Sequence, residues 1–257
     1  MPFTCYAVAT LCLREPFMSD KIRVVIMDDH QSIVDGYLYR LEKTPQIEVV
    51  GVANFGEELE PLLAQHPTQV ALLDVNVPIS PTNSNPYPIL HALPQLLQTY
   101  PDLSALIISM HAERSLIKAL MEAGISGYIL KDDHHTLREL GAVVLAVARG
   151  GIRFSQPALD LLLRYPASAS GPDALSTRQL EALSLCAAYP NHSINELARH
   201  MILAASTMRN MLSDAYVKLG VNNRGAAIIK AREMGLITPM VSTTTLRPAS
   251  PDRAEPL

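Results

Sequence analysis

The sequence predicts a doubly wound α/β domain with a five-stranded parallel sheet, followed by a small all-α domain. Two observations lead to this expectation. Before residue 150, short apolar runs without alternation, typical of parallel strands buried on both faces, are interspersed with helix-periodic segments. Beyond residue 174 only helical patterns occur, and a stretch rich in Pro, Ser and Gly separates the two parts. The 257 residues give room for two ordinary domains.

Polar side chains follow the clearest strand-like runs. The runs are 22–27, 70–73, 103–108 and 127–130, and they end in Asp28-Asp29, Asp74, Ser109 and Lys131, respectively. Because the carboxyl ends of parallel strands meet at one edge of an open sheet, these side chains are expected to converge. A single Asp there is commonly a turn former or helix cap, and a single Lys is commonly solvated. Five polar residues at successive strand ends instead favour a functional site.

The three carboxylates predict the chemistry of this edge. Like charges at close range raise each other's pKa, so a cluster of Asp28, Asp29 and Asp74 needs a compensating cation. Mg²⁺ suits a site built from few carboxylates, waters and phosphate oxygens. Ser109 would hold a phosphoryl oxygen and Lys131 would pair with an acyl phosphate or carboxylate. The sequence therefore predicts a metal-assisted phosphoryl site.

Helical periodicity fills the gaps between the strand-like runs. The expected helices cover residues 31–43, 57–66, 89–100, 113–123 and 135–149. Strands that alternate with helices imply right-handed crossovers, with helices on both faces of the sheet.

Residues 20–150 resemble the receiver domain of bacterial two-component response regulators, which has a flavodoxin-like sheet. The resemblance rests on the stretches VIMDDH (25–30), LLDVNVP (72–78), ISMH (108–111) and GYILKD (127–132). It implies that Asp74 accepts a phosphoryl group from a phosphohistidine on a sensor histidine kinase. It also implies a Mg²⁺ site made by Asp28, Asp29, Asp74 and the backbone carbonyl of Asn76. By the same resemblance Ser109 contacts the phosphoryl group, Lys131 pairs with it, and Tyr128 is an aromatic switch.

One stretch departs from that family pattern. After Pro78, residues 79–88 (ISPTNSNPYP) are several residues longer than the usual short turn and are rich in Pro and Asn. Such a composition indicates a loop. Because it lies beside Asp74, we expect this loop to affect regulation, either the choice of partner kinase or the rate of dephosphorylation.

Composition and charge agree with a two-domain cytoplasmic protein. Residues 20–150 hold 9 basic and 16 acidic side chains (net −7), whereas residues 173–240 hold 7 and 5 (net +2). An acidic domain beside a mildly basic one fits a metal site paired with a polyanion binder. The three Cys residues show no metal or disulfide spacing, and no apolar stretch is long enough to span a bilayer. Residues 1–19 are expected to be a disordered extension, with Met18 as an alternative start to Met1.

The second domain is expected over residues 175–237, after a linker at 151–174 and before a disordered tail at 238–257. Ser176 is a plausible N-cap, and Ser193 with Glu196 forms a capping box for the following short helix. A turn and a longer helix from Ser206 to Leu219 complete a helix-turn-helix arrangement, whose second helix enters the major groove of DNA. A last helix at 224–234 serves either dimerisation or the domain core.

This region resembles the LuxR-type DNA-binding domain. The resemblance rests on LSTRQ (175–179), NELA (195–198), STMRNML (206–212), YVKLGV (216–221) and Asn223-Arg224. It implies that Thr207, Arg209, Asn210 and Ser213 face double-stranded DNA, with Lys218 near the phosphate backbone. The match is looser than in the receiver: the break at 189–192 is about two residues longer, and Gln179 and Met211 replace the usual residues.

The two resemblances together indicate a response regulator of the NarL/FixJ class, which implies a homodimer that controls transcription in a phosphorylation-dependent way. Two alternatives come from other classes. A haloacid dehalogenase-type phosphatase also uses a strand-end Asp, but its acid/base Asp two residues later is Asn76 here, so only slow loss of the protein's own phosphoryl group is expected. A degenerate helix-turn-helix that binds another protein is the second alternative, since the third helix carries only Arg209 and Lys218 as cations.

Overall fold

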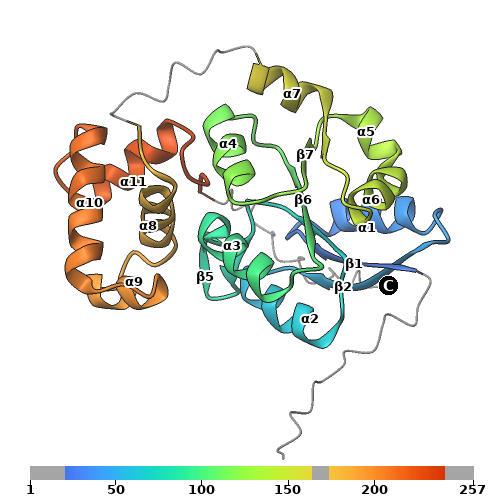
Figure 1. Ribbon diagram of the computed structural model, residues 1–257, viewed down its shortest axis with the longest axis horizontal. Helices are drawn as coiled ribbons and strands as arrows, with labels where there is room; N and C mark the ends of the chain where they lie inside the picture. Colours follow the sequence, from blue (N-terminus) through green and yellow to red (C-terminus); the bar gives the residue numbers. More distant parts are fainter. Residues whose placement is uncertain (1–20, 164–173, 241–257) are drawn as a thin grey trace, which may run out of the picture.

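The computed structural model describes residues 21–163 and 174–240. Six parallel strands form one sheet in the order β2-β1-β3-β6-β7-β8 (Figure 1). The strands are β1 Ile22–Met27, β2 Ile47–Ala53, β3 Val70–Leu73, β6 Ser104–Ser109, β7 Gly127–Leu130 and β8 Arg153–Phe154. The expected N-terminal extension, residues 164–173 of the expected linker and residues 241–257 of the expected tail lie outside the described residues.

The expected number of five strands is wrong by one, because β8 pairs with β7 at the edge of the sheet. Gly150 turns the chain with a φ of +82°, which glycine adopts readily. The amide of Arg153 then donates to the carbonyl of Ser126 (2.9 Å), and that of Ser155 donates to the carbonyl of Tyr128 (2.9 Å). A two-residue strand is too short to leave an apolar run in the sequence. Part of the expected linker therefore belongs to the sheet domain.

The sheet is buried on both faces, as its apolar runs predict. Successive side chains of a strand point to opposite faces, so Val25 enters one core and Val24 and Ile26 enter the other. One face is covered by α1 Gln31–Leu41, α5 His134–Arg138 and α6 Leu140–Ala148; the other is covered by α2 Leu59–Gln65, α3 Ile89–Thr99 and α4 Arg114–Glu122 (Figure 1). The helix expected over residues 135–149 is divided at Glu139 into α5 and α6. No helix in the described part of the chain is long and apolar enough to cross a bilayer.

The segment expected to be a loop at 79–88 contains a second, two-stranded sheet. β4 Pro78–Ser80 and β5 Asn83–Pro86 pair in antiparallel fashion, with Ser80 opposite Asn83. Proline lacks an amide donor and is tolerated at sheet edges, which explains how a Pro-rich sequence forms this short hairpin. Ile79 and Ser80 are buried, so the hairpin is packed against the protein rather than projecting into solvent.

The C-terminal domain consists of α8 Thr177–Ala188, α9 Ile194–His200, α10 Ala205–Leu219 and α11 Arg224–Glu233 around its own apolar core. The two predicted N-caps are confirmed: Ser176 accepts a hydrogen bond from the amide of Gln179 (3.2 Å), and Ser193 accepts one from the amide of Glu196 (3.3 Å). Gly220, with φ of +67°, ends α10 in the left-handed conformation that favours glycine.

Arg224 secures the carboxyl end of α8. Its guanidinium donates to the carbonyls of Cys186 (3.3 Å), Tyr189 (2.6 Å) and His192 (2.6 Å), groups that have no partner within the helix. We expect Arg224→Ala to lower the free energy of unfolding by about 1–3 kcal/mol, because the carbonyls of Cys186 and His192 lose the guanidinium donor and that of Tyr189 keeps only the amide of His192. Urea denaturation measures this loss. Lys230→Ala is the matched control, because its exposed ion pair with Glu233 (4.0 Å) contributes little.

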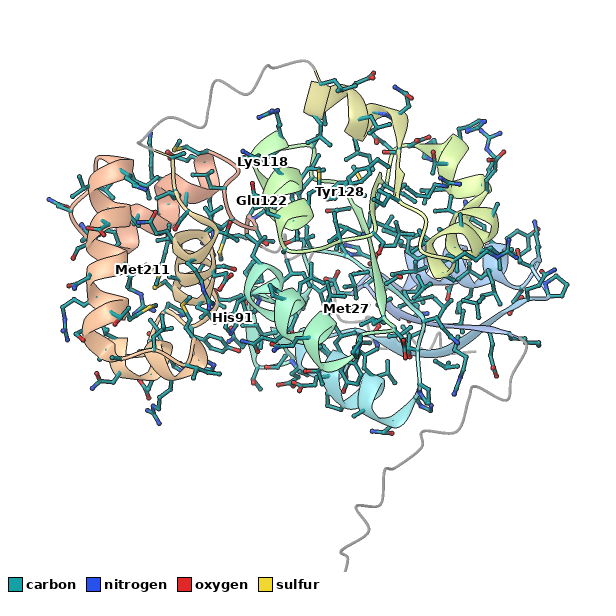
Figure 2. The ribbon with its side chains drawn as sticks, in the orientation of Figure 1. Met27, His91, Lys118, Glu122, Tyr128 and Met211 are labelled. Atoms are coloured by element: carbon teal, nitrogen blue, oxygen red, sulfur yellow. The ribbon has the colours of Figure 1, made fainter. Side chains whose placement is uncertain are left out.

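Helix α8 lies between the sheet domain and the rest of the helical domain (Figure 1). All residues from Gln179 to Ala188 are buried, and Leu180 belongs to the apolar core of the sheet domain. Two side chains of α4 also cross the interface: Glu122, labelled in Figure 2, accepts from the hydroxyl of Thr177 (3.0 Å), and Ser115 donates to the carbonyl of Gly235 (2.6 Å). The opposite side of α8 packs on α10 and α11.

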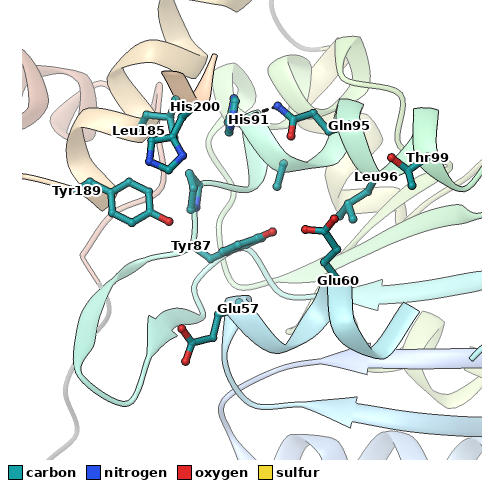
Figure 3. A pocket seen from close by; sticks show the side chains of 13 residues that line it. Glu57, Glu60, Tyr87, His91, Gln95, Leu96, Thr99, Leu185, Tyr189 and His200 are labelled. Atoms are coloured by element: carbon teal, nitrogen blue, oxygen red, sulfur yellow. Dashed lines mark hydrogen bonds between the residues drawn. The ribbon is translucent and has the colours of Figure 1, made fainter. Parts of the chain in front are cut away.

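A cleft of about 360 Å³ remains between α3 and the ends of α8 and α9 (Figure 3). His91 of α3 is buried there; its Nε2 contacts the amide of Gln95 (3.2 Å), and its Nδ1 has no partner. Burial lowers the pKa of His91 from 6.5 to about 4, with smaller contributions from Arg178 and from His200 when it is protonated.

This pKa makes the stability of the protein pH-dependent. Between about pH 6.5 and 4 the unfolded chain binds a proton at His91 that the folded protein does not, so stability falls as the pH falls. At pH 5 the expected loss is about 2 kcal/mol relative to pH 7. In His91→Gln, the free energy of unfolding should fall between pH 7 and pH 5 by an amount about 2 kcal/mol smaller than in the wild type, because all other titrating groups are the same in both proteins. Denaturation at both pH values measures the difference. An equal loss in both proteins would contradict the prediction.

Candidate functional site

The acidic residues predicted at the strand ends converge around the ammonium group of Lys131. Its Nζ lies 2.7 Å from an Asp28 oxygen and 2.8 Å from an Asp74 oxygen. Asp28 follows β1, Asp74 follows the neighbouring β3, and Lys131 follows β7. Parallel strands in register deliver all three side chains to the same edge, at the point where the strand order reverses. The geometry therefore brings together residues that are more than 100 positions apart in the chain.

Asp28, Asp74 and Lys131 are all buried, so their charges are poorly solvated and interact strongly with one another. Burial raises the pKa of Asp28, the charge of Lys131 opposes that rise, and the charge of Asp74 adds to it. For Lys131, burial lowers the pKa, but the charges of Asp74 and Asp28 outweigh it and hold the pKa above its ordinary value. One cation thus balances two close carboxylates, and the site retains an excess of negative charge.

Asp29 and His30 form the outer rim of the pocket. The Nδ1 atom of His30 lies 2.8 Å from an Asp29 oxygen, and the amide of His30 donates to Asp28 (3.0 Å). Possible ligand atoms of Asp28, Asp29 and His30 lie within 4.8 Å of one another. The carboxylate oxygens fit a hard divalent cation, whereas an imidazole nitrogen does not suit Mg²⁺. The position of His30 indicates that it orients Asp29.

Asn76 lies beside the candidate phosphoacceptor. Its amide nitrogen donates to the Oδ1 atom of Asp74 (3.3 Å), and its own side-chain oxygen is buried without a partner. An unpartnered buried oxygen on the residue that contacts Asp74 favours a cation or a water at this position. The residues present therefore fit a magnesium ion.

Ser109 and Tyr128 lie on the far side of the pocket and are completely buried. The Ser109 hydroxyl accepts from the amide of His111 (3.3 Å), and the Tyr128 hydroxyl donates to the carbonyl of His111 (2.7 Å). Burial raises the pKa of Tyr128, so this hydroxyl stays protonated and donates. The Tyr128 ring is completely buried in this structure, whereas a switch that follows the phosphoryl group is expected to turn inward only on phosphorylation.

The sequence analysis missed two residues that shape this edge. His111 ties Ser109 to Tyr128 through its backbone, and no sequence pattern identifies a backbone contact of this kind. Ser155 is buried next to β7, and its hydroxyl accepts from the amide of Leu130 (3.2 Å), immediately before Lys131. Ser155 directly follows β8, and a strand of two residues leaves no apolar run that would mark the position in the sequence.

A second candidate site is the outer face of α10. Thr207, Arg209, Asn210 and Ser213 are all exposed, while Met208 and Leu212 on the opposite face enter the core. α10 faces away from the sheet domain (Figure 1). Lys218 differs from the other predicted contacts, because its Nζ donates to the carbonyl of Ala174 (2.8 Å) and to the side chain of Gln179 (3.2 Å). The structure thus groups four of the five predicted DNA contacts on one open surface.

Comparison with known proteins relates most of the chain to one group of regulators. Residues 24–141 match the response regulator receiver domain. The chain is 30% identical over 222 residues to a probable transcriptional regulatory protein NarL of Mycobacterium tuberculosis, covering 85% of this chain and 97% of the relative. It is 28% identical over 246 residues to the transcriptional regulatory protein DegU of Brevibacillus brevis, covering 88% of this chain and 99% of that protein.

A solved structure shares the fold. RcsB of Salmonella enterica serovar Typhimurium, bound to the promoter rprA, superimposes with a TM-score of 0.57 at 22% identity. The match covers 82% of this chain and 98% of RcsB. At this identity the comparison supports the architecture: a parallel sheet with flanking helices followed by a helical domain.

Proposed function

Because the chain belongs to the response regulators that carry a receiver domain, we propose that it is a phosphorylation-dependent transcriptional regulator that binds double-stranded DNA. The observation that carries the proposal is the buried pair of Asp28 and Asp74, which contacts the single ammonium group of Lys131 at one edge of the sheet. The helical domain that follows exposes the polar face of α10. The relatives are named as transcriptional regulatory proteins and not as enzymes, and this supports the same assignment.

In this proposal Asp74 is the phosphoacceptor. One oxygen of its carboxylate attacks the phosphorus of a phosphohistidine on a sensor histidine kinase, a P–O bond forms, the P–N bond breaks, and the imidazole leaves with the electron pair. Asp28, Asp29, Asp74 and the backbone carbonyl of Asn76 would hold Mg²⁺, which supplies charge neutralisation for the phosphoryl oxygens. Lys131 already lies within 2.8 Å of the acceptor carboxylate and pairs with the added charge.

Ser109 is proposed to donate to a phosphoryl oxygen. Its hydroxyl accepts from the amide of His111 and also interacts with the Tyr128 hydroxyl, so turning its proton to a phosphoryl oxygen would release Tyr128 from that contact. Tyr128 then acts as a switch through the same His111 backbone, since its hydroxyl donates to the His111 carbonyl. A shift of Ser109 toward the phosphoryl group would move this segment and the start of α4.

The helical domain is proposed to read DNA with α10 in the major groove. Arg209 and Asn210 suit purine edges, whereas Thr207 and Ser213 position the helix on phosphates. Lys218 reaches the phosphate backbone only after leaving its contacts with Ala174 and Gln179. The exposed apolar side chain of Ile229 on α11 supports homodimerisation, which would place two α10 helices on half-sites about one helical turn apart.

The protein-interaction alternative is not favoured, because the exposed face of α10 carries polar residues and a cation rather than an apolar patch. The phosphatase alternative fails at Asn76, whose amide is no proton donor for rapid turnover. The proposed role places the protein in the cytoplasm, together with the transmitter part of a kinase and the chromosome.

The test is selection of fragments from sheared genomic DNA of the source organism by the full-length protein, with and without acetyl phosphate and Mg²⁺, at several salt concentrations. Selective enrichment that weakens with salt and strengthens on phosphorylation is expected. Failure to enrich any sequence in either state would contradict the DNA-binding function.

A further inference from the structure

The β4–β5 hairpin connects the candidate phosphoacceptor directly to the helical domain. Residues 75–77 are the only chain between Asp74 and β4, and Val75 and Val77 are buried in the core. The amide of Tyr87 donates to the carbonyl of Val77 (2.8 Å) and closes the base of the hairpin. Because this connection is short and packed in the core, a displacement of the backbone at Asp74 is expected to displace the hairpin as well.

The far end of the hairpin holds α8 through Asn83. The Oδ1 atom of Asn83 accepts from the backbone amide (3.1 Å) and the side-chain amide (2.8 Å) of Asn85. These two bonds identify Oδ1 as the acceptor and leave Nδ2 to donate to the carbonyl of Ala188 in the helical domain (3.3 Å). Asn83 is thus oriented by its own hairpin to donate across the domain interface.

The carbonyl of Ala188, to which Asn83 donates, has no hydrogen-bond donor within α8. Ala188 is the last residue of α8, where carbonyls have no amide partner within the helix. Arg224, from the same domain, donates to the neighbouring carbonyls of Cys186 and Tyr189. The end of α8 is therefore capped jointly by its own domain and by the receiver domain.

The hairpin contact acts together with the other bonds between the two domains, which are the burial of Leu180 in the sheet-domain core and the hydrogen bonds of Ser115 and Glu122. Tyr87, directly after the hairpin, lines the cleft that also contains Tyr189 and His200 (Figure 3). Elsewhere in the receiver domain, α7 Gln156–Leu163 packs against α4 and β7 and covers the strand that carries Tyr128. The hairpin therefore links the acidic pocket to the helical domain on a side of the receiver domain away from α7.

We propose that the hairpin is a docking clamp that couples the phosphorylation of Asp74 to the release of the helical domain. The inference rests on the proposed function and adds a regulatory element to it. Asp74 now accepts from the Asn76 amide and from Lys131. A phosphoryl group on one Asp74 oxygen draws both donors to phosphoryl oxygens, which moves residues 75–77 and the base of the hairpin. Asn83 then loses its alignment with the Ala188 carbonyl.

Hydrogen–deuterium exchange of the full-length protein tests this clamp. In the unphosphorylated protein, Asn83→Ala is expected to raise exchange in the peptide covering residues 177–188 by about threefold to tenfold, as loss of one interdomain hydrogen bond implies. Ser84→Ala is the matched control, because the Ser84 side chain is exposed and lies outside the Asn83 network. Exchange at wild-type rates in Asn83→Ala would overturn the clamp.

The coupling is tested by repeating the measurement after treatment with acetyl phosphate and Mg²⁺, with the intact mass of each sample recording phosphorylation. Phosphorylation should raise α8 exchange in the wild type and in Ser84→Ala, and add little in Asn83→Ala. A phosphorylated Asn83→Ala protein that responds as strongly as the wild type would overturn the coupling. Absence of a phosphoryl group on the wild type would instead contradict the proposed function, while the clamp result in unphosphorylated protein would stand.

Discussion

Asp74→Asn is expected to abolish phosphorylation of the protein by acetyl phosphate in the presence of Mg²⁺. An amide oxygen is a poor nucleophile and the variant lacks one of the two carboxylates that hold Lys131, so no acyl phosphate forms. The fold should survive, because the charge of Asp74 raises the pKa of Asp28 and its removal relieves that repulsion. Intact mass spectrometry measures the added phosphoryl group.

Asp102→Asn is the matched control for this substitution. Asp102 is exposed and precedes β6, at the opposite edge of the sheet from the acidic pocket. This variant should gain the phosphoryl group to the wild-type extent. Full phosphorylation of Asp74→Asn would show that another residue is the acceptor and would contradict the site described above.

Arg209→Ala is expected to weaken binding to a selected DNA site by about tenfold or more. A side chain that bonds a guanine edge in two places contributes about 1–3 kcal/mol of discrimination, and a lost cation also reduces the salt dependence of binding. The side chain of Arg209 is exposed on α10, so its removal should leave the core of the helical domain intact. Fluorescence anisotropy at several salt concentrations measures both effects.

Arg138→Ala removes the same charge from an exposed position on α5 of the receiver domain and serves as the control. Its DNA affinity should match that of the wild type. If both variants bind equally well, α10 does not contact bases through Arg209, and a different face of the helical domain must bind DNA.

Much of the acidic pocket follows from the sequence because strand topology makes its geometry predictable. Each of Asp28, Asp74, Ser109 and Lys131 lies at the carboxyl end of an apolar run, and parallel pairing is sufficient to bring them together. The caps at Ser176 and Ser193 follow in the same way from local pattern, since a capping box involves residues only three positions apart.

Features that depend on contacts between distant segments do not follow from the sequence. The family resemblance implies that Lys218 lies near the phosphate backbone, yet its ammonium donates to Ala174 and Gln179, which only the folded domain brings near. The hairpin strands are short and rich in Pro and Asn, so local composition indicates a loop, whereas burial of Ile79 and contact with α8 stabilise paired strands. The buried position of Tyr128 in this structure is likewise accompanied by a hydrogen bond to the carbonyl of His111, 17 residues away in the chain.

We propose that phosphorylation of Asp74 controls DNA binding. The most direct measurement is a DNA titration of the wild type and of Asp74→Asn, each before and after acetyl phosphate and Mg²⁺, on one selected fragment at fixed salt. We expect treatment to strengthen binding by the wild type and to leave the affinity of Asp74→Asn unchanged. Equal affinities of the wild type in both states, or the same gain in Asp74→Asn, would contradict it.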